Sequence, residues 1–418
     1  MANRFINSKW AKVYLANLID AMPYVKASKS YFADQMKGKK CGKTYSFVLR
    51  DSGKVTDGLA IASGDNKDIL EKEVKVTLKN KKNVVGLDVL ESVVDIESFD
   101  TEVGKPYGTH LGAEVQKDAI TNTVFDASSA HIEGSKVVSA SDSSGWGPLS
   151  HAIAGIKSRR VGGKVVGFLD PVAESNLTVA ALNNWSFAPS QKGEDFYGDG
   201  TIGRFQGGEF VYANDMPTVT GHTQPTGYSD LEFDGLEVSA NGKYFLKVDS
   251  SYKVTSNGTA GEVGQVIKAG NCFKIAGYKV CNSVGMPTNQ DFAFIVQTDT
   301  KASDKKVEVQ RVDIDEGGAR NCFKAGATDV AGKADFLLAS GVNYNIAQVR
   351  TVDALAFENA PLDDLVGAEN TTVEIGGIRL KQTVVGDVNS MENYTRWDIA
   401  YGAKIVDNRE ASLVYLRA

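Results

Sequence analysis

The segment from residue 221 to residue 343 constrains the fold most, because its composition differs from that of the chain on either side. It is dense in Gly, Asn, Asp and Ser, and it carries short alternating runs such as KYFLKVD (243–249) and DFAFIVQTDT (291–300). Strand signals separated by turn residues at this spacing are typical of a β barrel or sandwich. Both flanks mix helical and strand patterns. We therefore predict an α+β body that is interrupted by a self-contained all-β insert.

Residues 5–22 carry the first helical pattern. Apolar residues recur there at spacings of three and four: Ile6, Trp10, Val13, Tyr14, Leu18 and Met22. Two readings are open for this stripe: packing in the chain's own core, or docking of an N-terminal arm on a neighbouring subunit. Trp10, Tyr14 and Leu18 are the candidate subunit contacts on this helix.

Residues 41–90 read as extended strands. In EKEVKVTLKN (71–80), Val74, Val76 and Leu78 alternate with charged and polar residues, which indicates a strand wetted on one side. A long two-stranded excursion is barely stable by itself, so we expect another part of the assembly to support it. Phe47 and Leu49 are the candidate subunit contacts on this excursion.

The longest helical pattern covers residues 105–133, with Pro106 near its start and Gly134 as a stop signal. Val165–Leu169 is a short buried strand, after which Asp170 can cap a helix and Pro171 suits its first position. Strand patterns return after residue 343, in VRTVDALAFENAPL, in TTVEIGGIRLKQTVVG and in the closing YGAKIVDNREASLVYL.

Charge and cysteine usage exclude several classes of protein. The net charge of −6 over 418 residues is the wrong sign for a chain that grips nucleic acid by its phosphates. We interpret the basic clusters at residues 37–40 and 79–82 as solvated turns. None of the four cysteines forms a C-x-x-C pair, which favours a reducing compartment. We find neither a signal-peptide core nor an apolar run of the roughly 20 residues that a membrane span needs, and so expect folding in a cytoplasm.

A search for catalytic, cofactor or metal sites predicts none. GKKCGKT (38–44) has one residue too few between its glycines for a phosphate-binding P-loop, and the glycine-rich stretch 198–208 leads into a strand instead of a helix. The four histidines are scattered, and the cysteines lack the spacing of a zinc site. Acidic pairs such as Glu194 with Asp195 are read as solvated surface.

Four stretches resemble the coat proteins of short-tailed phages that infect enteric bacteria. In DGTIGRFQGGEFVYANDMPTVT (199–220), a D-G-T-I turn leads through an apolar strand to a proline, and a β-rich insert follows, as in that family. GFLDPVAESN and VDALAFENAPLDD are similar to the family's strand-to-helix step and to the strand that resumes after the insert. GDVNSMENYTRWDIAYGAKIVDNREASLVYL is similar to its closing pattern. The motifs cover residues 160–418, and only the order of elements agrees before residue 150.

This resemblance implies the capsid fold of tailed phages and herpesviruses, with an inserted β domain. It divides the chain into an N-terminal arm (1–40), an extended β-hairpin loop (41–80), a peripheral domain (81–149) with its spine helix at 105–133, an axial domain (150–220), the β-rich insertion domain (221–343) and a return to both domains (344–418). Residues 198–208 become a structural bend where the axial domain leaves for the insert, because glycine permits the φ > 0 that a sharp bend needs.

The resemblance implies a major capsid protein and no enzyme. Pentamers and hexamers of the chain would close into an icosahedral procapsid and then a virion shell around phage DNA, without sequence-specific DNA binding or a membrane. Assembly is expected in the host bacterial cytoplasm, with a portal and possible decoration proteins as partners. The chain starts at the arm, which implies a separate scaffolding protein. The alternatives are an encapsulin-like compartment, a secreted β-rich binding or adhesin protein, and a hydrolase with a dispersed acidic site.

Overall fold

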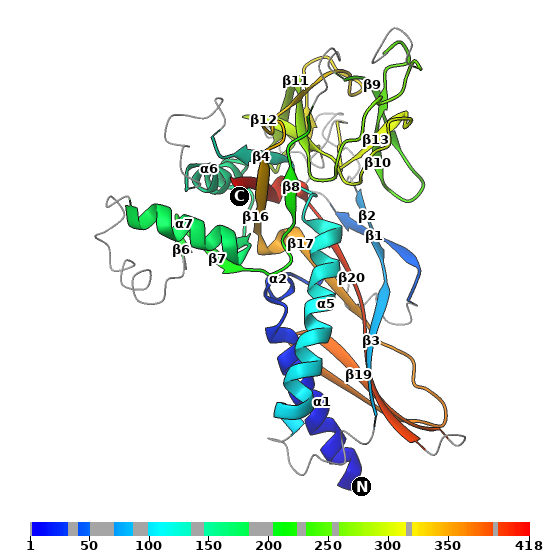
Figure 1. The fold of residues 1–418 in the computed structure, drawn as a ribbon. Helices are drawn as coiled ribbons and strands as arrows, with labels where there is room; N and C mark the ends of the chain where they lie inside the picture. Colours follow the sequence, from blue (N-terminus) through cyan, green and yellow to red (C-terminus); the bar gives the residue numbers. More distant parts are fainter. Residues whose placement is uncertain are drawn as a thin grey trace, which may run out of the picture. The chain divides into compact units, whose positions relative to one another are not determined.

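The structure is a computed structural model and has the mixed α+β class that the sequence predicts (Figure 1). It describes residues 2–31, 41–50, 71–86, 99–134, 146–183, 204–223, 231–252, 259–314, 320–387 and 392–418. The chain divides into two compact units. The first comprises residues 1–47, 75–123 and 355–404, and the second comprises residues 48–74, 124–354 and 405–418. No helix in the described part of the chain is long and apolar enough to span a membrane.

The first unit packs helices on an antiparallel sheet. Its helical elements are α1 (Ala2–Asp20), α2 (Pro23–Lys26), the π-helical turn η1 (Asp100–Gly104) and α5 (Lys105–Thr123). Its strands are β3 (Lys79–Gly86), β17 (Leu355–Ala360), β18 (Glu369–Ile375), β19 (Ile378–Asp387) and β20 (Glu392–Ile405). The strand order is β17-β20-β19-β18, and β3 also pairs with β20. β1 (Thr44–Arg50) and β2 (Glu71–Thr77) form a separate two-stranded sheet.

Helices α1 and α5 lie side by side in this unit (Figure 1), and glycines on α5 allow their close approach. Gly108 and Gly112 on α5, together with Gly104 at the end of η1, recur every four residues and so share one face of this helical segment. A Cβ placed on Gly112 would lie 2.5 Å from the backbone oxygen of Leu18 and 2.9 Å from the Cβ of Ala21. A Cβ on Gly108 would lie 3.0 Å from the backbone oxygen of Tyr14. Larger residues would therefore push α1 away from α5.

Stacked aromatic rings hold α1 against Phe99 and against Trp397 of β20. The ring of Trp10 stacks on Phe99 with centroids 4.8 Å apart, and the ring of Tyr14 stacks on Trp397 with centroids 4.6 Å apart. The Tyr14 hydroxyl donates to the backbone oxygen of Tyr107 at 3.0 Å. Tyr14, Leu15 and Leu18 are fully buried. Burial of rings of this size dominates packing energetics.

The N-terminal segment therefore has an intramolecular partner that its sequence did not reveal. Beyond α1, the Tyr24 hydroxyl is hydrogen-bonded to Thr123 at 2.8 Å, and the carboxylate of Glu358 accepts from Ser30 at 2.9 Å and from the Tyr31 amide at 2.6 Å. The core-packing reading is correct for the described side chains on the buried face of α1. Tyr14 and Leu18, two of the candidate subunit contacts, are covered completely by their own chain, and their role as subunit contacts stays a prediction.

The second unit is built on a mixed sheet covered by two helices. Its elements are β4 (Ser129–Ile132), α6 (Trp146–Ser158), β5 (Val165–Leu169), α7 (Pro171–Asn183), β6 (Arg204–Phe205), β7 (Gly208–Tyr212), β8 (Thr218–Thr220), β16 (Asn343–Thr351), the 3-10 turns η4 (Val352–Ala354) and η5 (Asn408–Glu410), and β21 (Ala411–Arg417). The order is β4-β21-β16-β5-β7-β6, with β8 also on β16. The Trp146 indole donates to the backbone oxygen of Leu177 and so joins α6 to α7. Asp170 caps α7 by accepting from the Val172 amide, and Pro171 is its first residue, as predicted.

The described residues between Glu232 and Phe336 form an all-β barrel within the predicted insert, whose bounds 221–343 stay a prediction. Its strands are β9 (Glu232–Val238), β10 (Tyr244–Val248), β11 (Cys272–Cys281), β12 (Pro287–Ile295), β13 (Lys306–Val309), β14 (Cys322–Phe323) and β15 (Gly332–Phe336). The order is β12-β11-β15-β9-β10-β13, with β14 on β11, and a bridge between Val296 and Val309 joins the two ends. Stacked rings of Phe233, Phe273 and Phe294 fill the barrel. The chain leaves through β8 and returns through β16, whose residues Thr220 and Asn343 pair directly.

Two sequence predictions need correction, and a third lies partly outside the described residues. The long helix ends at Thr123 and not at 133, because Ser129–Ile132 instead forms β4, which takes parallel backbone pairing from β21. The cluster 79–82 is not a turn but the start of β3, where Lys81 contacts Glu114 on α5 at 2.9 Å. The bend at 198–208 lies partly outside the described residues. Its described end is a hairpin turn at Gln206 and Gly207, both with positive φ, between β6 and β7.

Candidate functional site at the base of the insert

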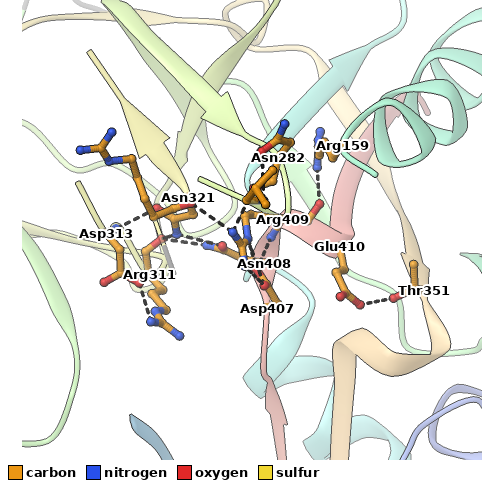
Figure 2. A network of polar contacts seen from close by, with 12 residues as sticks. Arg159, Asn282, Arg311, Asp313, Asn321, Thr351, Asp407, Asn408, Arg409 and Glu410 are labelled. Atoms are coloured by element: carbon orange, nitrogen blue, oxygen red, sulfur yellow. Dashed lines mark hydrogen bonds and ion pairs between the residues drawn. The ribbon is translucent and has the colours of Figure 1, made fainter. Parts of the chain in front are cut away.

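A short turn between β20 and β21 holds the insert on its parent sheet. Asp407 begins the turn, and its carboxylate accepts from the backbone amide of Arg409 at 3.0 Å. Asx capping of this kind is what an aspartate at the start of a 3-10 turn provides. The residues Asn408 and Arg409 are buried, so the turn projects polar groups into the protein instead of into water (Figure 2).

Arg409 joins the turn to two parts of the insert. Its guanidinium pairs with Asp407, with Nη2 2.5 Å from Oδ2. Its Nη1 donates to the backbone oxygen of Asn282, in the β11–β12 turn, at 3.0 Å and to that of Arg320 at 3.2 Å (Figure 2). A planar guanidinium offers five donors in a fixed fork. Arg409 therefore sets the position of the insert relative to β21 within this unit.

Arg159, at the end of α6, is a second buried arginine, and its described partners are neutral oxygens. Nη1 donates to the backbone oxygen of Arg409 at 2.7 Å, and Nη2 donates to the side chains of Gln290 on β12 at 2.6 Å and Ser129 on β4 at 2.5 Å. Burial lowers the pKa of Arg159 to about 9, which leaves the group charged at neutral pH. The backbone of Arg159 also accepts from the Ser283 amide at 3.0 Å.

Asparagine pairs complete the junction. The amide of Asn408 donates to the backbone oxygen of Arg311 at 2.8 Å, and Asn321 donates to the Asn408 side chain at 2.9 Å. Asn321 accepts in turn from the Asp313 amide at 2.7 Å, and Asp313 pairs with Arg311 at 2.5 Å (Figure 2). On the other side of the turn, the Thr351 hydroxyl donates to Glu410. Within this network, Arg311 Nε is a buried donor without a hydrogen-bond partner in the structure.

The polar groups of this site hold the insert in position. Its charged groups are used in fixed hydrogen bonds to backbone and amide oxygens, and we see no nucleophile–base pair among them. Among the described residues, no group of three His, Cys, Asp or Glu is placed to hold a metal ion. The four thiols are free, and burial raises the pKa of Cys281 to about 11 and that of Cys272 to about 12. Thiols of such high pKa are poor nucleophiles at neutral pH.

A half-buried histidine lies beside this network. His131 is on β4, and burial, together with the nearby charge of Arg159 and His151, lowers its pKa to about 3. Its Nε2 has no hydrogen-bond partner in the structure. His131 is therefore neutral across the physiological range.

The predicted contact residues do not converge on this site. Trp10, Tyr14 and Leu18 lie in α1 of the first unit, where Trp10 remains partly exposed. Phe47 lies on β1 and is 2% exposed, so its own chain covers it as well. The side chain of Leu49 lies outside the described residues. The apolar face predicted for β2 is correct, since Val74, Val76 and Leu78 are buried.

Sequence reasoning used the stretch VDNREASLVYL as a family pattern and missed that its Asp407-Asn408-Arg409 carries the junction. A signal was present, because four polar residues interrupt two strands of buried apolar residues. Arg159 gave a weaker signal, as a basic residue at the end of an apolar helix. The partners of Arg409 in the insert, in the β11–β12 turn and just before β14, are backbone oxygens, which no residue type in the sequence could indicate.

Comparisons with known proteins give similar structures only. No protein-family model matches this chain, and no curated protein sequence does. A structure described as Mycobacterium phage Che8 is similar over 94% of this chain and 90% of that chain, at 11% identity and a TM-score of 0.43. The capsid structure of cyanophage P-SCSP1u is similar over 93% and 88%, at 8% identity and 0.41. The acid-stable capsid structure of the Helicobacter pylori bacteriophage KHP30 is similar over 95% and 92%, at 10% identity and 0.40.

Proposed function

We propose that this chain is the major capsid protein of a tailed phage, whose copies assemble into an icosahedral shell around phage DNA. The observation that carries the proposal is the insert, which begins directly after the D-G-T-I segment. The chain leaves the parent sheet through β8 and returns beside it through β16, which is the arrangement that the sequence resemblance implies. The four motifs also fall on elements of the expected kind, namely β5 with α7, β7, β17, and β20 with β21.

The first unit fits a shell wall. A long helix and an arm helix stiffen one face of an elongated antiparallel sheet, in which β20 alone runs for 14 residues. Subunits of a shell meet many neighbours, so individual contacts can be weak and still act together. The subunit-contact role of Trp10 remains part of this proposal, because that ring is partly exposed.

The insert is assigned a mechanical role. A barrel with its own core, attached by two arginines and several asparagines, keeps a defined orientation on the axial sheet. Such a domain stabilises its parent or reaches toward a neighbouring subunit. The scaffolding protein, portal and decoration proteins are further proposed partners, and assembly is placed in the host bacterial cytoplasm.

Electron microscopy of the chain expressed with and without a candidate scaffolding protein tests the proposal. Closed or aberrant shells are the expected result. Shells that contain nucleic acid after infection favour the capsid, whereas shells that hold an enzyme favour the encapsulin-like alternative. A chain that stays monomeric at every concentration, with or without the partner, contradicts both.

A further inference from the structure

The connection from β17 to β18 exposes two aliphatic side chains that no described residue covers. Residues 363–367 are all exposed. At their centre Leu365 is 52% exposed and Val366 is 98% exposed, the highest exposed fraction of any large hydrophobic residue in the described part of the chain. A single exposed valine is common on protein surfaces and needs no explanation. Two adjacent exposed aliphatic side chains, Leu365 and Val366, on one braced loop are less common and call for a functional explanation.

The loop around them is rigid, because other side chains brace its backbone. The Asn370 amide nitrogen donates to the backbone oxygens of Leu365 at 2.9 Å and Ala368 at 3.0 Å, and its oxygen accepts from the Leu365 amide at 3.2 Å. The Ala368 amide donates back to Leu365, and Gly367 has a φ of +82°. This is a turn with Val366 at its apex. A braced turn loses little conformational entropy when it docks.

Acidic groups surround this apolar apex. Asp363 and Asp364 precede it, both exposed, and Glu369 follows it. Lys381, almost wholly buried, anchors the base of the loop through the backbone oxygen of Asp363 and through Asp364 at 3.3 Å. The partner that fits is therefore an apolar surface with a basic border.

The same chain carries such a surface on β3. Lys79 and Lys81 of that strand turn toward carboxylates of α5, so Lys82 and Val84 point to the other face of the sheet. Val84 is 46% exposed and Lys82 is exposed. Arg396 lies directly opposite Val84 in the β3–β20 register, and its half-exposed side chain pairs with the carboxylate of Asp398 at 2.6 Å. Val84 thus has the exposed cation Lys82 along its own strand and an arginine–aspartate ion pair across from it.

We propose that the Leu365–Val366 turn is a docking knob, and that its partner is the Val84 surface of a second copy of this chain. The inference rests on the proposed self-assembly and names one of its contacts. Each copy carries both surfaces, so it can give its knob to one neighbour and accept the knob of another. Heterologous contacts of this type close into rings when the rotation between copies allows it.

Serine substitutions test the knob first. Val366→Ser, alone and with Leu365→Ser, should weaken each contact by about tenfold, the factor that corresponds to losing the burial of one valine side chain. The concentration at which particles form should rise accordingly. Val238→Ser, at a residue 54% exposed on β9, is the matched control and should assemble like the unmodified chain. Normal assembly of Val366→Ser overturns the proposal.

Cross-linking then identifies the partner. In a Cys41→Ser background, which removes the one thiol that is not buried, copies with Val366→Cys are assembled with copies that carry Val84→Cys and are oxidised. A covalent dimer with one copy of each is expected. Covalent dimers from Val366→Cys copies alone would place like apices together and overturn the Val84 assignment, as would particles without any cross-link. If the unmodified chain forms no particles at all, the result contradicts the proposed capsid function itself, and with it the docking contact that rests on it.

Discussion

The contact of α1 with α5 and the contact of the insert with its parent sheet join segments in opposite ways. The helices meet through glycines and a hydrogen bond from Tyr14 to Tyr107, and ring stacking of Tyr14 on Trp397 holds the other side of α1 on β20, so close packing and burial fix α1. The insert is held by two buried arginines that donate mainly to backbone and amide oxygens. Apolar packing tolerates substitutions that conserve the total volume, whereas a buried charge is destabilising unless its hydrogen-bond partners are kept. Single substitutions should therefore destabilise the contact of the insert with its parent sheet more than the contact of α1 with α5.

The largest contrast should appear when the segments are isolated. The insert, expressed as residues 221–343, should fold alone, because its barrel is closed by the Val296–Val309 bridge and has its own aromatic core. An α1 peptide of about the same length as the helix should remain largely unfolded in water, because short helices gain their stability from tertiary packing. Dispersed amide proton shifts for the insert and circular dichroism of the peptide give the readout. A random-coil spectrum for the insert would show that its fold depends on the junction.

Removing Arg409 should be the most damaging single change at the junction. Arg409→Ala leaves the carboxylate of Asp407 without its buried partner, and breaking such a pair lowers the free energy of unfolding by about 3–5 kcal/mol. The control is Arg379→Ala, whose ion pair with Glu374 lies at the surface of the first unit and should contribute less than about 1 kcal/mol. Denaturant unfolding of both variants measures the difference. If Arg409→Ala and Arg379→Ala lose the same free energy of unfolding, the junction contributes no more than a surface ion pair.

Acid should weaken the second unit through His131. Its pKa is depressed to about 3 in the folded chain, against about 6.5 when unfolded. Below pH 6.5 the unfolded state binds the proton and the folded state does not, so stability falls by about 1.4 kcal/mol per pH unit until the folded pKa is reached. His131→Gln should flatten this dependence, and His110→Gln, at an exposed site on α5, should leave it unchanged. An identical pH profile for all three proteins would refute the assignment.

Gly112→Ala should produce a smaller loss in the first unit. The new Cβ would lie 2.5 Å from the Leu18 backbone oxygen, and overpacking of this kind destabilises by about 1–3 kcal/mol. The higher helix propensity of alanine offsets up to about 1 kcal/mol of this loss in the free energy of unfolding. Thr109→Ala, exposed on the same helix, is the control and should be neutral or slightly stabilising. If Gly112→Ala gains stability, α1 does not approach α5 as closely as described.

Local pattern predicted much of the fold. The capped step from β5 to α7, the alternation of β2 and the all-β character of the insert follow from spacing and turn chemistry that act over a few residues. The end of the long helix was wrong because a distant strand, β21, takes the backbone of residues 129–132 into a sheet. The partner of α1 was missed because its glycine seam was not recognised, and Trp397 lies far along the sequence.

The partners of the junction arginines could not be predicted from the sequence, for a different reason. Arg409 donates to the backbone oxygens of Asn282 and Arg320, which every residue type carries, and Arg159 donates to the side chain of Gln290, which is far away in the sequence. Only the fold brings these groups together. The candidate contacts Phe47, Tyr14 and Leu18 are covered by their own chain. Apolar periodicity shows that a face is buried and does not show which part of the chain, or which neighbour, buries it.

Sedimentation velocity of the full-length chain over a range of concentrations, with and without a scaffolding partner, tests the central claim most directly. A shell-forming subunit should show a slow species at low concentration and, above a threshold, a fast particle of fixed size with little material between them. A single slow species at every concentration under both conditions would contradict the account.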